Sequence, residues 1–174
     1  MTPSSTTVEA PPAGTYALDP AHTSIAFVTR HMFGLARVKG TFALESGTVT
    51  VGDPAETSSV EAEIRTASFS TRNPMRDVQV RSRLWLNAKQ HPRISFRANR
   101  ITHGEHEGRL SGTLRVRGHA APLELLITEL TSDGSALTVR ANGVVDRYAQ
   151  GVKMMKGMAA RTLTFEVTAR ATRV

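Results

Sequence analysis

The chain has 174 residues, a net charge of +7 from 22 Lys and Arg against 15 Asp and Glu, and no cysteine. A chain of this length is expected to form one domain that buries about two thirds of the surface exposed by its unfolded form. The lack of cysteine excludes disulfides, a thiolate nucleophile and metal sites built on thiolates.

Residues 1–13 are rich in Pro, Ser and Thr and hold little apolar surface. Burial of so little surface cannot offset the entropy of ordering, so we expect a disordered tail over 1–13 and one domain over 14–174. The tail lacks the basic and apolar parts of a secretory signal. No later run approaches the roughly 20 apolar residues of a membrane span, so we expect a cytoplasmic protein.

The stretch HTSIAFVTRH, residues 22–31, has a histidine at each end of a short apolar run. In a strand, His22 and His31 lie at opposite ends and on opposite faces, so one metal ion cannot join them. Asp19 stands before Pro20, and its carboxylate is expected to fix the turn into this strand by accepting hydrogen bonds from backbone N–H groups.

Apolar and polar residues alternate through five later stretches, which is typical of strands with one buried face. Turn sequences at 52–56, 103–108 and 131–135 predict antiparallel hairpins, and about eight strands result. The positions expected to face inward are Val60, Ala62, Ile64, Ile94, Phe96, Ala98, Leu110, Gly112, Leu114, Val116, Leu137, Val139, Ala141, Gly143, Val145, Leu163, Phe165, Val167 and Ala169.

Two segments break the alternation. In 73–92, Asn73 can cap and Pro74 can open a short helix, which predicts a long crossing between two strands. The second segment, 148–160, contains Met154, Met155 and Met158. These methionines are expected either to form an adaptable edge of a binding site or to pack beneath a loop.

The alternation predicts an all-β fold, an antiparallel barrel of about eight strands with a short helical crossing segment, and leaves a two-sheet sandwich as the alternative. Small residues at inward positions, with only nine aromatic residues in the chain, favour an apolar cavity inside the barrel. The competing possibility is that Trp85 and Leu86 fold inward and plug it. Either interior offers few polar groups to orient a polar substrate.

The polar residues form no pattern that indicates catalysis or metal binding. His103 and His106 lie in a turn, where an exposed polar cluster is the simpler interpretation. Neither a nucleophile elbow nor a glycine-rich phosphate loop occurs, so we expect no catalytic residue, no metal site and no cofactor.

The positive charge is concentrated in residues 72–117, which carry 11 basic and 3 acidic residues. An arginine-rich outer face on the strands can be merely solvated, or it can touch an anionic membrane transiently. Non-specific nucleic-acid binding is a second hypothesis. It ranks below the others because the arginines have no exposed aromatic residues beside them on which bases could stack. Arg93, Arg97, Arg115 and Arg117 are expected to project outward.

Six segments in order resemble the YceI-like polyisoprenoid-binding proteins. They are YALDPAHTSIAFVTRH (16–31), RVKGTF (37–42), ASFSTRNPMRD (67–77), RSRLW (81–85), HPRISF (91–96) and GTLRVRGHAAPLEL (112–125). Compared with the family pattern, Gln79 stands in place of a common His, and Trp85 and Leu86 in place of a Phe pair. The segment 146–158 departs further.

The resemblance implies a lipocalin-like barrel whose apolar tunnel holds a long isoprenoid, such as an isoprenoid quinone or polyprenyl lipid, or a similar fatty amphiphile, for sequestration, storage or transport. Arg76, Arg81 or His31 would meet the polar end of that ligand at a mouth. A barrel enzyme acting on an apolar substrate and a homodimer both remain open. The residues expected to contact the ligand are Ile25, Phe27, His31, Phe42, Ile64, Arg76, Trp85, Phe96, Ala98, Leu114, Ala141 and Phe165.

Overall fold

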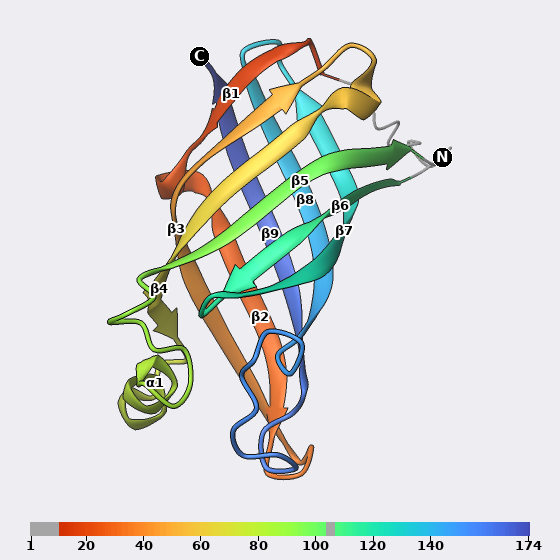
Figure 1. Ribbon diagram of the computed structural model, residues 1–174. Coiled ribbons are helices and arrows are strands. Elements are labelled where there is room, and N and C mark those ends of the chain that lie inside the picture. Colours follow the sequence, from red (N-terminus) through yellow and green to blue (C-terminus); the bar gives the residue numbers. More distant parts are fainter. Residues whose placement is uncertain (1–10, 104–106) are drawn as a thin grey trace, which may run out of the picture.

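The computed structural model describes residues 11–103 and 107–174, which form an antiparallel barrel with one α-helix (Figure 1). The helical elements are α1 (Pro74–Arg81) and two short 3-10 turns, η1 (Pro20–His22) and η2 (Ala55–Thr57). The strands are β1 (Gly14–Leu18), β2 (Ser24–His31), β3 (Ala36–Val51), β4 (Ser59–Ser70), β5 (Arg93–His103), β6 (Gly108–Val116), β7 (His119–Ser132), β8 (Ala136–Asp146) and β9 (Thr162–Arg173).

The sheet is closed, because β3 pairs with both β2 and β4 while every other neighbour in the order is also hydrogen-bonded. Strands β1 and β2 share one position between β3 and β9, each pairing with a different half of those two long strands. Nine strand segments therefore fill eight positions. The predicted barrel is confirmed, and the sandwich alternative is wrong.

The break between β1 and β2 lies at η1, where the sequence predicted a turn. The Asp19 carboxylate accepts a hydrogen bond from the backbone N–H of Ala21 at 2.9 Å, as expected. Its other oxygen lies 2.7 Å from Nδ1 of His22. The hydrogen bond with His22 holds the pKa of Asp19 below its ordinary value.

The crossing between β4 and β5 also begins as predicted. The Asn73 side chain caps α1 by accepting from the N–H of Arg76, and Pro74 occupies the first turn. Asp77 is buried and accepts from the N–H and the hydroxyl of Thr71, so it anchors the helix to the end of β4 rather than pairing with Arg76.

Glycines facing the interior are covered by neighbouring side chains. A Cβ on Gly112 would lie 2.8 Å from the Phe96 ring, and one on Gly143 would lie 2.7 Å from a methyl group of Leu125. The expectation that these two positions leave open space is therefore wrong, because larger residues on adjacent strands fill it. Among the inward alanines, Ala62, Ala141 and Ala169 do line the cavity.

No helix in 11–103 or 107–174 is long and apolar enough to cross a membrane. The expectations for residues 1–10 and for His106 lie outside the residues that the structure describes.

Candidate ligand cavity

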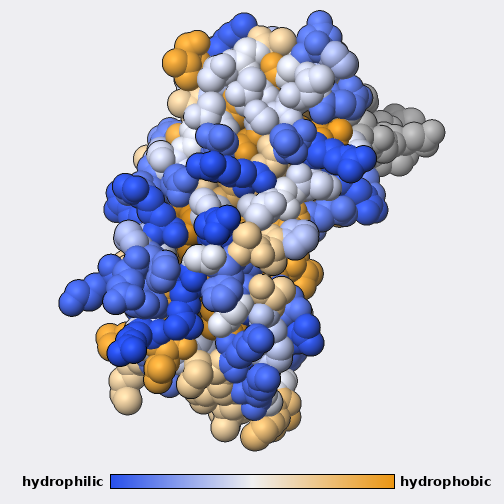
Figure 2. Space-filling view, viewed as in Figure 1, coloured by the Kyte–Doolittle hydropathy of each residue, from blue (hydrophilic) through white to orange (hydrophobic). Residues whose placement is uncertain are grey.

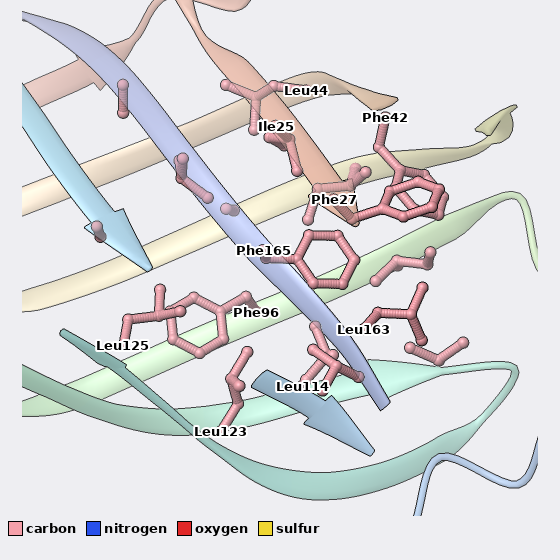
Figure 3. Close-up of a pocket in the computed structure, with 18 of the residues that line it drawn as sticks. Ile25, Phe27, Phe42, Leu44, Phe96, Leu114, Leu123, Leu125, Leu163 and Phe165 are labelled. Carbon is pink, nitrogen blue, oxygen red and sulfur yellow. The ribbon is translucent and has the colours of Figure 1, made fainter. Parts of the chain in front are cut away.

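An apolar cavity with a volume of about 390 Å³ runs through the barrel interior. This volume lies within the range of small-molecule sites in proteins. Figure 3 shows apolar side chains from β2, β3, β5, β6, β7 and β9 converging on this space. Among the described residues, no Asp or Glu lines it. Such a lining favours a hydrocarbon chain over a polar substrate.

Eleven of the twelve residues expected to contact a ligand line the cavity. They are Ile25, Phe27, His31, Phe42, Ile64, Arg76, Trp85, Phe96, Leu114, Ala141 and Phe165. Ala98 is the exception: it is buried, pairs with Gly112 in the β5–β6 register and does not line the cavity. Its methyl group occupies the space that the missing Gly112 side chain leaves.

Four phenylalanines of the cavity wall form one aromatic cluster. The Phe27 ring lies 5.5 Å from the rings of both Phe69 and Phe165, and 5.7 Å from that of Phe42, centroid to centroid. These separations are typical of packed aromatic pairs. The cluster therefore packs β2, β3, β4 and β9 against one another at one side of the cavity.

The cavity extends to the end of the barrel that carries α1, where some of its lining residues are exposed. Of all its described lining residues, only Arg30, Gln79 and Met155 are exposed, and all three lie at this end. The side-chain nitrogen of Gln79 lies 3.8 Å from the sulfur of Met155, which joins α1 to the loop between β8 and β9. Arg30, Arg76, Gln79 and Met155 therefore form the mouth of the cavity.

Trp85 and Leu86 lie beside this mouth, each 8% exposed. They fold inward as the plug hypothesis required, but they cover only the α1 end, and both line the remaining cavity. The sequence analysis set an open cavity against a plug formed by Trp85 and Leu86, and the structure has both a cavity and a partial plug at one end.

Arg147 fixes the loop that covers the same end. Its guanidinium donates to the carbonyl oxygens of Val152, Ala159 and Ala160 at 2.8–3.0 Å and lies 5.4 Å from the centre of the Trp85 ring. Burial lowers the pKa of Arg147 from its ordinary value. Since the cation replaces water with three carbonyls and a ring face, it ties the loop to the crossing segment.

The two histidines of the first long strand have different surroundings. His31 lines the cavity, whereas the His22 side chain is 68% exposed and paired with Asp19. His22 is therefore not part of the lining. In the described portion of the chain, no cluster of three or more His, Asp or Glu side chains is arranged to hold a metal ion.

Three polar residues that line this end of the cavity were not predicted from the sequence. Arg30 alternates outward in β2 yet reaches the rim, and Arg147 and Gln150 lie next to or within a segment with no period to assign a face. Arg81, expected at the mouth, instead donates to the carbonyl of Phe69 and does not line the cavity. A usable signal was present, since segment 147–161 combines four basic residues and three methionines with no acidic residue.

The YceI-like domain family matches residues 16–171, nearly the whole barrel. The chain belongs to the YceI-like family. Among solved structures, this YceI-like barrel is similar to BcnA of Burkholderia cenocepacia, with a TM-score of 0.78 and 21% identity over 89% of this chain and 99% of that one. No curated protein matches it.

Two other solved structures share the YceI-like fold. A polyisoprenoid-binding domain from Saccharophagus degradans, implicated in plant cell wall breakdown, has a TM-score of 0.69 and 14% identity over 91% of this chain and 98% of that one. The YceI protein of Campylobacter jejuni has a TM-score of 0.59 and 23% identity over 78% of this chain and 86% of that one.

Proposed function

We propose that this protein binds the hydrocarbon chain of a long isoprenoid, or of a similar amphiphile, inside the barrel, for sequestration, storage or transport. The observation that carries the proposal is the apolar cavity of about 390 Å³, which no described Asp or Glu lines and which extends to the end of the barrel bearing α1. The likeness of the fold to the polyisoprenoid-binding domain from Saccharophagus degradans supports the same ligand class.

Binding of this kind needs no specific bonds along the chain. Each buried CH2 contributes about 0.8 kcal/mol, so ten or more carbons give useful affinity through burial alone. The length and shape of the cavity would then set selectivity. We assign the protein a carrier role rather than catalysis.

The polar end of the ligand would lie at the mouth, beside Arg30, His31, Arg76 and Gln79. These side chains offer hydrogen-bond donors, which suit a quinone carbonyl or a phosphate group. Cations at the mouth would favour a charged phosphate more than a neutral alcohol.

The test begins with organic extraction of the purified protein, followed by mass spectrometry of the extract. A stoichiometric isoprenoid or fatty chain is the expected result. The emptied protein is then titrated with polyprenyl alcohols of increasing length, and affinity should rise with each added unit until the cavity is full.

An empty barrel whose affinity for these alcohols does not change with length would overturn the proposal. Salt-dependent binding of DNA by that empty barrel would favour the nucleic-acid hypothesis instead. For the head group, Arg76→Gln should weaken binding of a polyprenyl phosphate more than binding of the alcohol of equal length.

A further inference from the structure

Large apolar side chains are exposed mainly at one end of the barrel. Eight of the ten large hydrophobic residues exposed in the described structure lie in three segments, 28–39, 71–91 and 147–161, which we call the docking end. A concentration of exposed apolar side chains in one region of a protein surface usually marks a site that binds another protein or a membrane. The eight are Met32, Phe33, Leu35, Met75, Val78, Leu84, Met154 and Met155.

The three segments form one continuous surface. His31 bridges to Ala159, the N–H of Ala160 donates to the carbonyl of Arg30, and Gln79 touches Met155. Figure 1 shows α1, the β2–β3 turn and the β8–β9 loop together at the lower end of the barrel. In the same view, Figure 2 shows hydrophobic and hydrophilic surface side by side there.

This end also carries the positive charge of the molecule. Its three segments hold twelve Lys and Arg and one Asp, a net charge of +11, whereas the rest of the chain holds ten basic and fourteen acidic residues, a net charge of −4. The single acid, Asp77, is buried against Thr71. Positive charge is therefore concentrated at one end of the barrel, and the rest of the chain carries a net negative charge.

The basic residues of the docking end differ from those on the barrel wall in their partners. On the wall, Arg93 pairs with Glu45, and Arg97 with Glu63. At the docking end, Arg161 is the one basic residue that forms an ion pair within the described structure. Arg93, Arg97 and Arg115 are exposed as expected, whereas Arg117 is half-buried. Basic residues without an ion pair in the described structure are concentrated at the docking end.

The β2–β3 turn carries bulky apolar residues in a backbone conformation that does not favour them. Met32 and Phe33 have φ values of +53° and +58°, a conformation that favours glycine and asparagine and disfavours bulky side chains. Phe33 is nevertheless 74% exposed. A turn shaped by folding alone would carry smaller polar residues here.

We propose that the docking end binds an anionic lipid bilayer, with the apolar residues entering the interface and the surrounding cations meeting the headgroups. Apolar tips within a basic surface are the combination that interfacial binding requires. A second copy of the chain fits poorly, because two such ends would face each other with the same charge. Nucleic acid would meet the cations but leave the aliphatic tips unused.

The mouth of the cavity, formed by Arg30, Arg76, Gln79 and Met155, lies within this surface. Docking would therefore bring the mouth against the bilayer, where a chain could pass between membrane and barrel without crossing water. The docking proposal does not depend on what the cavity holds, so vesicle binding and lipid retention are measured separately.

The experiment is cosedimentation of the full chain with phosphatidylcholine vesicles, with and without phosphatidylserine, at low and high salt. Phe33→Asn and Leu35→Asn each remove an apolar tip, and Val174→Asn is the matched control, since Val174 is 85% exposed at the other end of the barrel. Arg83→Gln with Lys153→Gln removes charge, and Arg93→Gln with Arg97→Gln is its control.

Binding should require phosphatidylserine and weaken with salt. Phe33→Asn should reduce partitioning about tenfold without lowering the melting temperature, and each lost cation should reduce it about fivefold, while both controls bind as the wild type does. Equal effects of Phe33→Asn and Val174→Asn would overturn the proposal. So would failure to bind phosphatidylserine vesicles, including the case where the wild type self-associates through this end.

Discussion

The aromatic ring of Phe27 lies across Gly40, its partner in the β2–β3 register. A Cβ on Gly40 would overlap that ring and would also lie 2.8 Å from the carbonyl oxygen of Ser70. The glycine therefore lets the ring lie flat against the wall, where it meets three other phenylalanines. One missing side chain on β3 positions the aromatic wall of the cavity.

Gly40→Ala should destabilise the fold, because the ring and the carbonyl cannot both move away. We expect a loss of about 1–3 kcal/mol and a melting temperature lower by several degrees. Gly108→Ala is the control, since its Cβ would meet Ile127 at an ordinary 3.6 Å. Equal melting temperatures for the two variants would contradict the packing described for Phe27.

Two alanines that look alike in the sequence should respond differently to enlargement. Ala141 lines the cavity, so Ala141→Phe should place its ring in the open space, keep the melting temperature and exclude the ligand. Ala98 is packed against Gly112 outside the cavity, so Ala98→Phe should cost about 1–3 kcal/mol.

The measurement for this pair is the melting temperature together with lipid retained after purification. The alternation assigns both alanines inward and gives no reason to distinguish them, whereas the structure separates them. A stable Ala98→Phe variant would show that the strand packing around Gly112 is looser than described.

Arg147→Ala should release the loop between β8 and β9, because three carbonyl oxygens lose their donor at once. We expect a loss of about 2–5 kcal/mol and faster hydrogen exchange at amides 148–160. Arg147→Lys should not rescue it, since an ammonium group lacks the planar fork. Arg161→Gln, which removes an exposed ion pair with Asp146, should leave the melting temperature nearly unchanged.

Acid should weaken the fold through Asp133. Its carboxylate accepts hydrogen bonds from the N–H groups of Ser135 and Ala136, which holds the pKa of Asp133 below the ordinary value of 3.8. Because the pKa of this carboxyl is lower in the folded state than in the unfolded state, its ionised form stabilises the fold at a pH above the unfolded-state pKa. That contribution is lost as the pH falls through the folded-state pKa. Asp133→Asn should therefore lower the melting temperature near neutral pH and lose that difference in acid.

A chelator should leave both the melting temperature and lipid binding unchanged. The described residues include no cluster of three potential metal ligands, and His31 and His22 have separate environments. Metal analysis of the purified protein checks this expectation. Unfolding on removal of a bound ion would contradict it.

The barrel was predictable because alternation carries most of the information about a strand's orientation. Ile64, Leu114 and Phe165 were assigned inward by a period of two, and all three line the cavity. The same reasoning failed at Gly112 and Gly143, because alternation gives the direction of a position and says nothing about which neighbour fills its space.

The mouth was less predictable than the walls. Arg147 and Gln150 lie next to or within an aperiodic segment, so their roles depend on contacts with Trp85 and other distant residues. The apolar turn MFGL at 32–35 was the overlooked signal, since turns usually carry polar residues. An apolar turn marks a contact surface even where its place in the fold is unknown.

The two ends of the described chain meet on the side of the barrel opposite α1. The N–H of Val174 donates to the carbonyl of Thr15 at 2.9 Å, and the Arg173 guanidinium donates to the carbonyl of Ala13. Figure 1 shows this junction at the far end from α1. A fluorescent reporter or a surface tether joined to the C-terminus would thus leave the mouth unobstructed. A circular permutant linked here, with new ends in the exposed η1 break, would keep every strand pairing of the barrel.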